Sequence, residues 1–384
     1  MTGLAPKDIT LYVVEETVPG TINASPVFKA FRRTGGHAID NIPYLQSAEV
    51  ADDDQPVEQI ADTATYQADI EFEATKQTFE YLPKAIQAVE ETVLTLAETD
   101  IEANALGYVD AAGDGFAPVS VNDYIYVDGY DLAANNGWKR VTVKNGDDDI
   151  EVLPATAVEA AGDSVTFTCY KNVSASTVPK YTAQTRIVDL SKAGNIDYAS
   201  YYSGVIDAFS MSIGESGLVT GSANFKFEKK VAGTAVIAGQ TDAAADTSAK
   251  IHSSNHVKAF WIDGVRQDCV IKSMEFSFAQ NFNADKAAAC PGEEYTGGTK
   301  TLSGGLVSRL ATSNSTVWRD RYQDGTNVAL AFEILHTDGS NTLISIPRAK
   351  ITAHAIPDTN GVISTSDMTY TAEITSATMF SDWT

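Results

Sequence analysis

The stretch "LVTGSANFKFE", residues 218–228, decides the fold class, because apolar and polar residues alternate along it. Val219, Ala223 and Phe225 fall on one side, while Thr220, Ser222 and Asn224 would fall on the other. A repeat of two residues is typical of a β-strand with one face on a core and one face in water. The stretch therefore predicts an amphipathic strand.

The same alternation recurs along the chain and indicates a mainly β fold with few helices. Further strands are predicted at residues 69–75, 181–188, 205–213, 299–307, 328–335, 346–355 and 368–375. One helix is predicted over residues 83–96, because Ile86, Val89 and Val93 recur at three- and four-residue spacing after Pro83. A weaker helix is predicted over residues 313–322, ended near Gly325.

A segment with a different rhythm interrupts the first half of the chain. Between residues 104 and 172 the predicted strands are short and turns come every eight to twelve residues, which is typical of a small barrel or sandwich. Within it, "GYDLAANNGWKRV" (129–141) contains Asn135-Asn136-Gly137, residues that tolerate the positive φ of a tight hairpin. We interpret this segment as an inserted β-barrel module.

The order of predicted elements occurs twice. Each half contains a polar loop, a strand, a helix, another strand and a pair of strands, although residue identity between the halves is negligible. We therefore expect two β-sandwich or barrel lobes. The expected division is a first lobe (1–103), the insert (104–172), the strands completing the first lobe (173–240), a linker or loop (241–250) and a second lobe (251–384).

The charge balance restricts the partners of the protein. Lys plus Arg number 27 against 51 Asp plus Glu, a formal net charge of −24. Such an excess argues against a protein that grips phosphate backbones and fits a surface that repels nucleic acid. Three cysteines without metal-ligand spacing favour a reducing compartment. With no basic-then-apolar leader and no apolar run of spanning length, we expect synthesis in a cytoplasm and no membrane partner.

No catalytic constellation emerges from the residues. "HSSNH" (252–256) has the spacing of two helical zinc ligands but lacks the glutamate of that motif, and a solvated loop is the better interpretation. "TGGTKTLSGG" (296–305) is not a phosphate loop, and "IGESGL" (213–218) is not a nucleophile elbow. The acidic runs at 51–54 and 146–149 lack the ligand ladder of a calcium site. We expect no enzyme, no cofactor and no metal.

Three stretches resemble one protein family. "YYSGVIDAFSMSIGESGLVTGSANFKFEKK" (201–230) is similar to the central hairpin of the tail tube proteins, or major tail proteins, of long-tailed non-contractile bacteriophages. "TYQADIEFEATKQTFEYLPKAIQA" (65–88) resembles the strand-then-helix unit of that family. "HTDGSNTLISIPRAKITAH" (336–354) resembles its signature near the C-terminus, and the insert resembles a module found in many of its members.

The resemblance implies a structural virion protein, made in the bacterial host cytoplasm and located in the virion tail. It implies stacked rings that form the tail tube, enclose the tape measure protein and conduct DNA during ejection. The implied partners are other copies, the tape measure protein, and the tail terminator and distal tail proteins, with DNA passing without specific binding. The alternative from the residues is a secreted or fibre-borne β-sandwich that serves in binding or adhesion.

In such a tube the wet strand faces are expected to line the channel. The lumen-facing candidates are Asp69, Glu71, Glu73, Thr220, Ser222, Asn224 and Glu228. The acidic loop is expected to contact the next ring through Asp52, Asp53, Asp54 and Glu58. The insert should project outward, since it would otherwise block the channel.

The repeated order of elements also bears on ring symmetry. The resemblance implies a six-fold tube. If each chain supplies two lobes, three chains per ring make a pseudo-six-fold channel, with six chains as the alternative.

Overall fold

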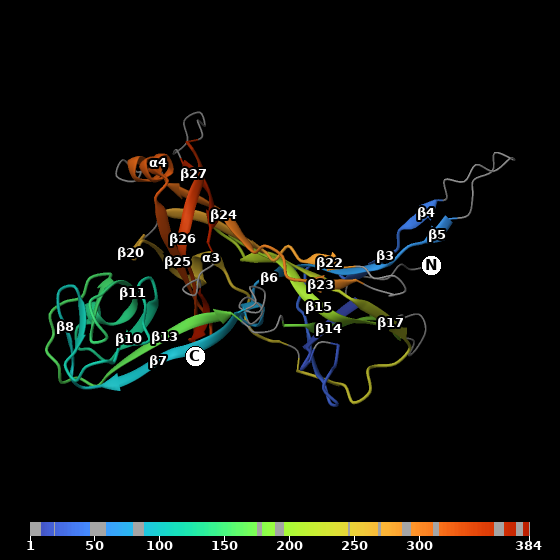
Figure 1. Cartoon of the computed structure of the whole chain (residues 1–384), viewed down its shortest axis with the longest axis horizontal. Helices are drawn as coiled ribbons and strands as arrows, with labels where there is room; N and C mark the ends of the chain where they lie inside the picture. The colour runs from blue at the N-terminus through green and yellow to red at the C-terminus, as the bar shows by residue number, and fades with distance from the viewer. Residues whose placement is uncertain are drawn as a thin grey trace.

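The computed structural model describes residues 9–18, 20–46, 59–79, 88–174, 179–188, 196–244, 246–267, 270–285, 293–309, 315–356, 365–373 and 379–383. Over these residues the fold is mainly β, as predicted. Figure 1 shows an elongated molecule with two lobes and a third body, the module, joined to them by a long two-stranded ribbon.

The first lobe is made by the N-terminal strands and by strands that follow the module. Its elements are β1 (Ile9–Glu15), β2 (Val27–Ala30), β3 (Ala38–Asn41), β4 (Tyr44–Gln46), β5 (Gln59–Ala61), β6 (Thr65–Glu73), α1 (Lys76–Phe79), β14 (Tyr181–Val188), β15 (Ile196–Ile213), β16 (Thr220–Phe227), β17 (Lys229–Gly233) and β18 (Thr241–Asp242). The expected linker contains β18, which pairs with β2, and Asp246, which forms an ion pair with Arg32 at 3.3 Å. It therefore packs on the first lobe.

The second lobe is continuous in sequence. Its elements are α3 (Ser253–His256), β19 (Val257–Ile262), β20 (Val265–Arg266), β21 (Ile271–Ala279), β22 (Asn283–Asp285), β23 (Glu294–Thr296), β24 (Thr301–Arg309), α4 (Ser315–Asp324), β25 (Asn327–Leu335), β26 (Asn341–Ala355), β27 (Thr365–Ala372) and β28 (Met379–Trp383). The weaker predicted helix is confirmed by α4, and Gly325 after it has φ 63°. All the predicted strands are present; most ends are shifted by a few residues, and β15 begins nine residues before the predicted 205.

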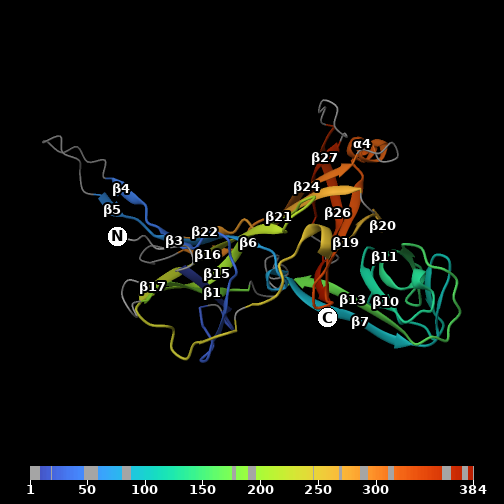
Figure 2. The same cartoon turned by 180° about the vertical axis from the view of Figure 1, so that it is seen from behind.

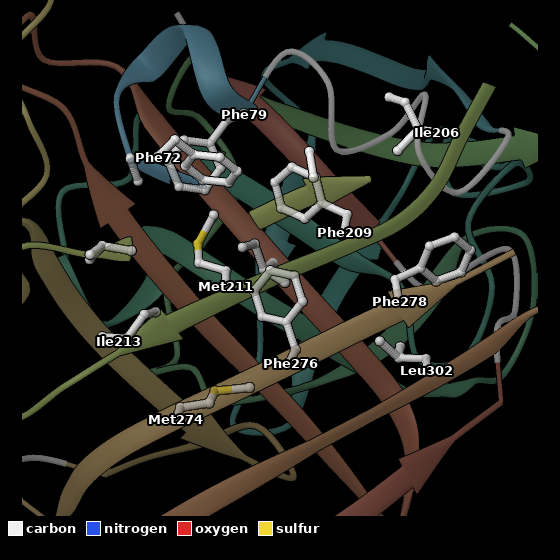
Figure 3. Close-up of a cluster of buried hydrophobic side chains, with 14 of the residues drawn as sticks. Phe72, Phe79, Ile206, Phe209, Met211, Ile213, Met274, Phe276, Phe278 and Leu302 are labelled. Carbon is white, nitrogen blue, oxygen red and sulfur yellow. The ribbon is translucent and has the colours of Figure 1, made fainter. Parts of the chain in front are cut away.

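Eight neighbouring strands of one 17-stranded sheet run through both lobes and form what is called here the eight-stranded sheet. Its order is β3-β6-β16-β15-β21-β24-β27-β26, and every neighbouring pair is antiparallel. One face covers a shared core in which aromatic side chains from both lobes meet, among them Phe72, Phe209 and Phe276 (Figure 3). The alternation read from residues 218–228 thus recurs in β6 and β21 of this sheet.

The two lobes pair their strands in the same order. In the first, β6 pairs with β16, β16 with β15, β15 with β14, and β14 with β1. In the second, β24 pairs with β27, β27 with β26, β26 with β25, and β25 with β19. The long strands β15 and β26 each pair with a further strand through their N-terminal halves, β17 and β28. The repeated order in the sequence therefore has a counterpart in the hydrogen-bonding pattern.

The module is a sheet of seven strands that interrupts the first lobe. Its elements are β7 (Ala88–Glu98), β8 (Ile101–Ala103), β9 (Gly107–Asp110), β10 (Tyr124–Asp128), a 3₁₀ turn (Ala133–Asn135), β11 (Gly137–Lys144), β12 (Asp149–Leu153) and β13 (Val165–Ser174). The order is β7-β13-β10-β11-β12-β9-β8. The expected barrel is not closed, because the outer strands β7 and β8 do not pair with each other, and the sheet begins at Ala88 rather than at residue 104.

The predicted helix over residues 83–96 is wrong. Residues 83–87 lie outside the described residues, and from Ala88 the chain is strand β7, paired with β13 from Ala88 opposite Ser174 to Glu98 opposite Val165. The segment is rich in valine and threonine, whose branched side chains favour strands. Pairing with a distant strand therefore overrode a helical spacing of apolar residues.

The predicted tight turn in the module is a longer loop. Positive φ occurs at Gly129 (110°) and Gly137 (87°), whereas Asn136 is extended. Asn135 is instead buried, and its side chain accepts a hydrogen bond from the Ala157 N–H at 2.7 Å. The asparagines therefore hold the loop by side-chain bonds rather than by backbone conformation.

The module packs against the second lobe, and both views show the two side by side (Figure 1 and Figure 2). Tyr124 and Trp138 of the module form a buried apolar cluster with Trp261 and Leu343 of the second lobe. Gly264 also approaches the module closely, since a Cβ there would lie 2.7 Å from the Leu153 Cβ. The β10–β11 hairpin thus supplies the surface through which the module packs against the second lobe.

Gly304 of β24 has no side chain and therefore lets the aromatic ring of Tyr370 lie close to the strand. A Cβ there would overlap the Tyr370 hydroxyl and the Glu275 carbonyl oxygen, which are joined by a hydrogen bond of 2.9 Å. We expect Gly304→Ala to lower the free energy of unfolding by about 1–3 kcal/mol, because overpacking displaces the buried ring. Guanidinium denaturation measures this.

Gly305 provides the matched control for that substitution. A Cβ there would meet nothing nearer than the Met368 carbonyl oxygen at 3.8 Å. Gly305→Ala should therefore leave the stability nearly unchanged. Equal losses in the two variants would contradict the explanation from close approach.

His336 gives the contact between α1 and the second lobe a dependence on pH. Its ring lies 5.7 Å from that of Phe79, and its Nε2 is 2.7 Å from the Thr342 hydroxyl. Burial lowers the pKa of His336 to about 4, while Asp338 opposes this shift and Lys76 and His256 add to it. The neutral ring is the form that the fold stabilises.

A folded-state pKa below the unfolded value means that unfolding takes up a proton between pH 6.5 and 4. The stability from His336 is therefore complete above pH 6.5 and is lost as the pH falls through 4. We expect a loss of about 2–3 kcal/mol between pH 7 and pH 4. His336→Gln should remove this part of the pH dependence in denaturation curves. If the free energy of unfolding changes between pH 7 and pH 4 by the same amount in His336→Gln and in the natural protein, the assignment to His336 is refuted.

Candidate functional site: the hydroxyl-rich face of the sheet

The face of the eight-stranded sheet opposite the core is rich in hydroxyl groups. Cross-strand register aligns its side chains in rows across the strands. One row consists of Glu71, Ser222, Ser210, Ser277, Ser303, Thr371 and Lys350. The next consists of Glu73, Thr220, Ser212, Glu275, Gly305, Thr369 and Ala353. The rows cross from one lobe to the other without a break.

Short polar side chains bind one another across this face. The hydroxyls of Ser210 and Ser222 lie 2.7 Å apart, and those of Thr352 and Thr369 lie 3.0 Å apart. The Asn224 amide donates to the Asp69 carboxylate. These bonds satisfy polar groups within the face and keep the side chains close to the sheet.

The face is also hollowed. A depression of about 830 Å³ lies over β6, β16, β15, β21, β24 and β27, and a second of about 440 Å³ adjoins it over β6, β16 and β15. Glycines at positions 221, 304 and 305 line the larger one. A concave polar face with short side chains is suited to surround a large object rather than to enclose a small ligand.

Charge on the face is mainly negative. Asp69, Glu71 and Glu275 are exposed on it, and Glu73 forms an ion pair with Lys250 at its margin. Lys350 is at the end of the first row. Carboxylates without a facing cluster of cations repel phosphate groups.

The structure brings together six of the seven candidates for the lumen. Glu228 is the exception: it follows the end of β16, its N–H binds the Tyr202 carbonyl, and its carboxylate pairs with Lys180. The stacking candidates Asp52, Asp53, Asp54 and Glu58 lie outside the described residues. The sequence-based candidates include no residue of the second lobe, although "SMEFSFA" at 273–279 alternates as clearly as the first lobe's strands.

The described residues contain one acidic group with metal-like spacing. Single carboxylate oxygens of Asp131, Glu159 and Asp163 lie within 4.8 Å of one another. Backbone N–H groups of Asp131 and Leu132 and the Asn135 amide donate to Glu159, and they account for its position. Within the "HSSNH" stretch, the expected loop is the short helix α3, and the Nδ1 atoms of both histidines accept backbone N–H groups.

Comparison with known proteins adds the family. The phage tail tube protein family profile matches residues 6–375. No curated protein matches the chain significantly. Among the described residues no helix has the length and apolar character to cross a membrane. A match over nearly the whole length is decisive: the chain belongs to the phage tail tube protein family.

Proposed function

We propose that this protein polymerises as stacked rings into the tube of a long, non-contractile phage tail, with the hydroxyl-rich face lining the lumen. The tube encloses the tape measure protein during assembly and conducts DNA during ejection. The observation that carries this proposal is the single sheet that crosses both lobes, with an apolar core on one face and a polar, acidic, concave surface on the other.

The chemistry of that face suits transport without binding. A DNA duplex is held by lysine and arginine contacts to its phosphates, each of which displaces a counterion. The exposed charges on this face are mainly carboxylates, and its hydroxyls bond to one another. DNA would therefore pass along it with weak interactions. This role needs no catalytic group, and we assign no enzymatic activity.

The acidic loop remains the candidate for contacts between rings. The hairpin β4–β5 that carries it extends away from the body of the first lobe (Figure 1 and Figure 2). A groove of about 510 Å³ between β19 and β21 carries Lys258, Lys272 and Arg309 and offers a complementary charge. In the virion, the partners at the tube ends would be the tail terminator and the distal tail protein. Synthesis and assembly would take place in the host cytoplasm.

Electron microscopy tests the proposal directly. The purified chain, concentrated in low-salt buffer, should form hollow rods visible in negative stain, with a central channel of constant width. A β-sandwich adhesion module would remain monomeric or form compact oligomers. Absence of rods at all protein concentrations, and in the presence of the tape measure protein, would refute the assignment.

A further inference from the structure

The internal joint between the lobes indicates how separate copies join. In this joint the C-terminal half of β15 pairs with β21, from Ala208 opposite Ala279 to Ile213 opposite Met274. The pairing merges two four-stranded sheets into the eight-stranded one. Phe209 and Phe278, which face each other across it, are buried.

The two outer edges of the eight-stranded sheet are the equivalents of the two halves of this joint. β26 corresponds to β15: each has a bulge, at Thr352 between Ile351 and Ala353 and at Asp207 between Ile206 and Ala208. β3 corresponds to β21, because it pairs with β6 as β21 pairs with β24. Among the described residues, neither β3 nor the end of β26 beyond Lys350 has a strand on its outer side.

Resting on the function proposed above, we propose that β3 of one copy pairs with the end of β26 beyond Lys350 in the next copy, continuing the sheet around the ring. The occupant of each edge is thus a second copy of this chain. Antiparallel pairing between copies satisfies both open edges and leaves no free edge once the ring closes.

The correspondence between the two lobes also fixes the register in which β3 and β26 of neighbouring copies pair. Aligning the two bulges makes Ser210 equivalent to Ala355 and Met211 equivalent to Ile356. Ile39 pairs with β6 at the same position at which Ser277 pairs with β24, so these two residues are equivalent. Since Ser210 lies opposite Ser277 in the internal joint, Ala355 lies opposite Ile39 between copies.

Exposed apolar side chains gather at these two edges. Ile39 and Ile356 are 41% and 49% exposed, and beside β3 Ile42 and Tyr44 are 44% and 62% exposed. In the internal joint the corresponding hairpin, β22–β23, is covered: Phe282 and Tyr295 form a buried cluster with Val205 of β15. The hairpin β4–β5 thus offers apolar surface that a neighbouring copy would cover in the same way.

The two joints differ in their side chains. The internal pair Phe209 and Phe278 is equivalent to His354 and Asp40 between copies. Two buried aromatic rings are thus replaced by two polar groups. This difference suits an internal contact that is permanent and an external contact that forms during assembly.

A cysteine pair tests the register in assembled tubes. In the variant Ile39→Cys/Ala355→Cys the two thiols face each other across the joint, within reach of a disulfide. Mild oxidation should convert the assembled protein into covalently closed rings on non-reducing gels. The matched control Ile39→Cys/Ala353→Cys is displaced by two residues and should cross-link at least tenfold less. The unsubstituted protein, oxidised in the same way, measures the background cross-linking from its own three cysteines.

Mixing single variants keeps the test open if the double variant does not assemble. Equal amounts of Ile39→Cys and Ala355→Cys chains should give cross-linked dimers, whereas either alone should give none. Tubes that form but cross-link equally in both registers, or in neither, would overturn this joint and leave the tube function standing. Failure of the natural protein to form tubes would instead refute the proposed function.

Discussion

Rings released from the tube are expected to contain three chains and to have a mass of about 123 kDa, three times 41.0 kDa. The reason is the number of strands that each chain would give to the proposed channel wall. Each chain supplies eight paired strands, four from each lobe, so three chains would close a wall of 24 strands. Native mass spectrometry of rings dissociated from tubes measures this directly.

Channel width separates the two ring sizes. At a strand spacing of about 4.8 Å, 24 strands give a circumference of roughly 115 Å and a backbone diameter of roughly 37 Å, which strand tilt increases. Six chains would give 48 strands and roughly twice that diameter. The smaller channel accommodates one DNA duplex with side chains on the wall.

An averaged tube image provides an independent check on the same prediction. It should show six similar lobes around the channel, with three-fold symmetry once the modules are resolved. A mass near 246 kDa, or six modules per ring, would mean that each chain supplies one sixth of the ring. The duplicated strand order would then need another explanation.

The mainly β fold could be predicted from the sequence because an amphipathic strand is a local pattern. In residues 218–228 each side chain's environment follows from the parity of its position, whereas in β25 the alternate residues Ala329 and Ala331 are buried as well. The helix predicted over residues 83–96 failed because this segment pairs with β13, in which Ser174, the partner of Ala88, lies 86 positions further along the chain. Local spacing contains no information about such a partner.

The first lobe's part of the candidate lumen surface could be predicted from the sequence, and the second lobe's part could not, for a related reason. Asp69, Glu71, Thr220 and Ser222 follow from alternation within single strands. The union of both lobes into one sheet depends on the pairing of β15 with β21, which joins residues more than sixty positions apart. The hydroxyl rows that cross this joint, and the open edges at β3 and β26, exist only once that pairing is known. Glu228 lies apart from the other candidates because β16 ends one residue before it.

The module should be dispensable for tube formation if it is removed at the ends of its sheet. None of the eight strands of the proposed channel wall lies within residues 88–174, nor does either open edge. Ala88 and Ser174 are register partners at the base of the ribbon, so a short glycine-serine linker can join the flanking chains. Deletion at residues 104 and 172 would instead leave β7 without β13, its long partner strand.

Removing the module uncovers Trp261 and Leu343, which Tyr124 and Trp138 bury in the complete chain. We therefore expect the deletion alone to form tubes but to associate laterally through this apolar patch. Adding Trp261→Gln and Leu343→Thr should give separate tubes that are thinner than those of the full chain and have the same channel width. The measurements are negative-stain diameters and pelleting at increasing salt. If both deletion variants fold, by circular dichroism, and yet form no rings, the module is part of the wall, and the outward position inferred for it is wrong.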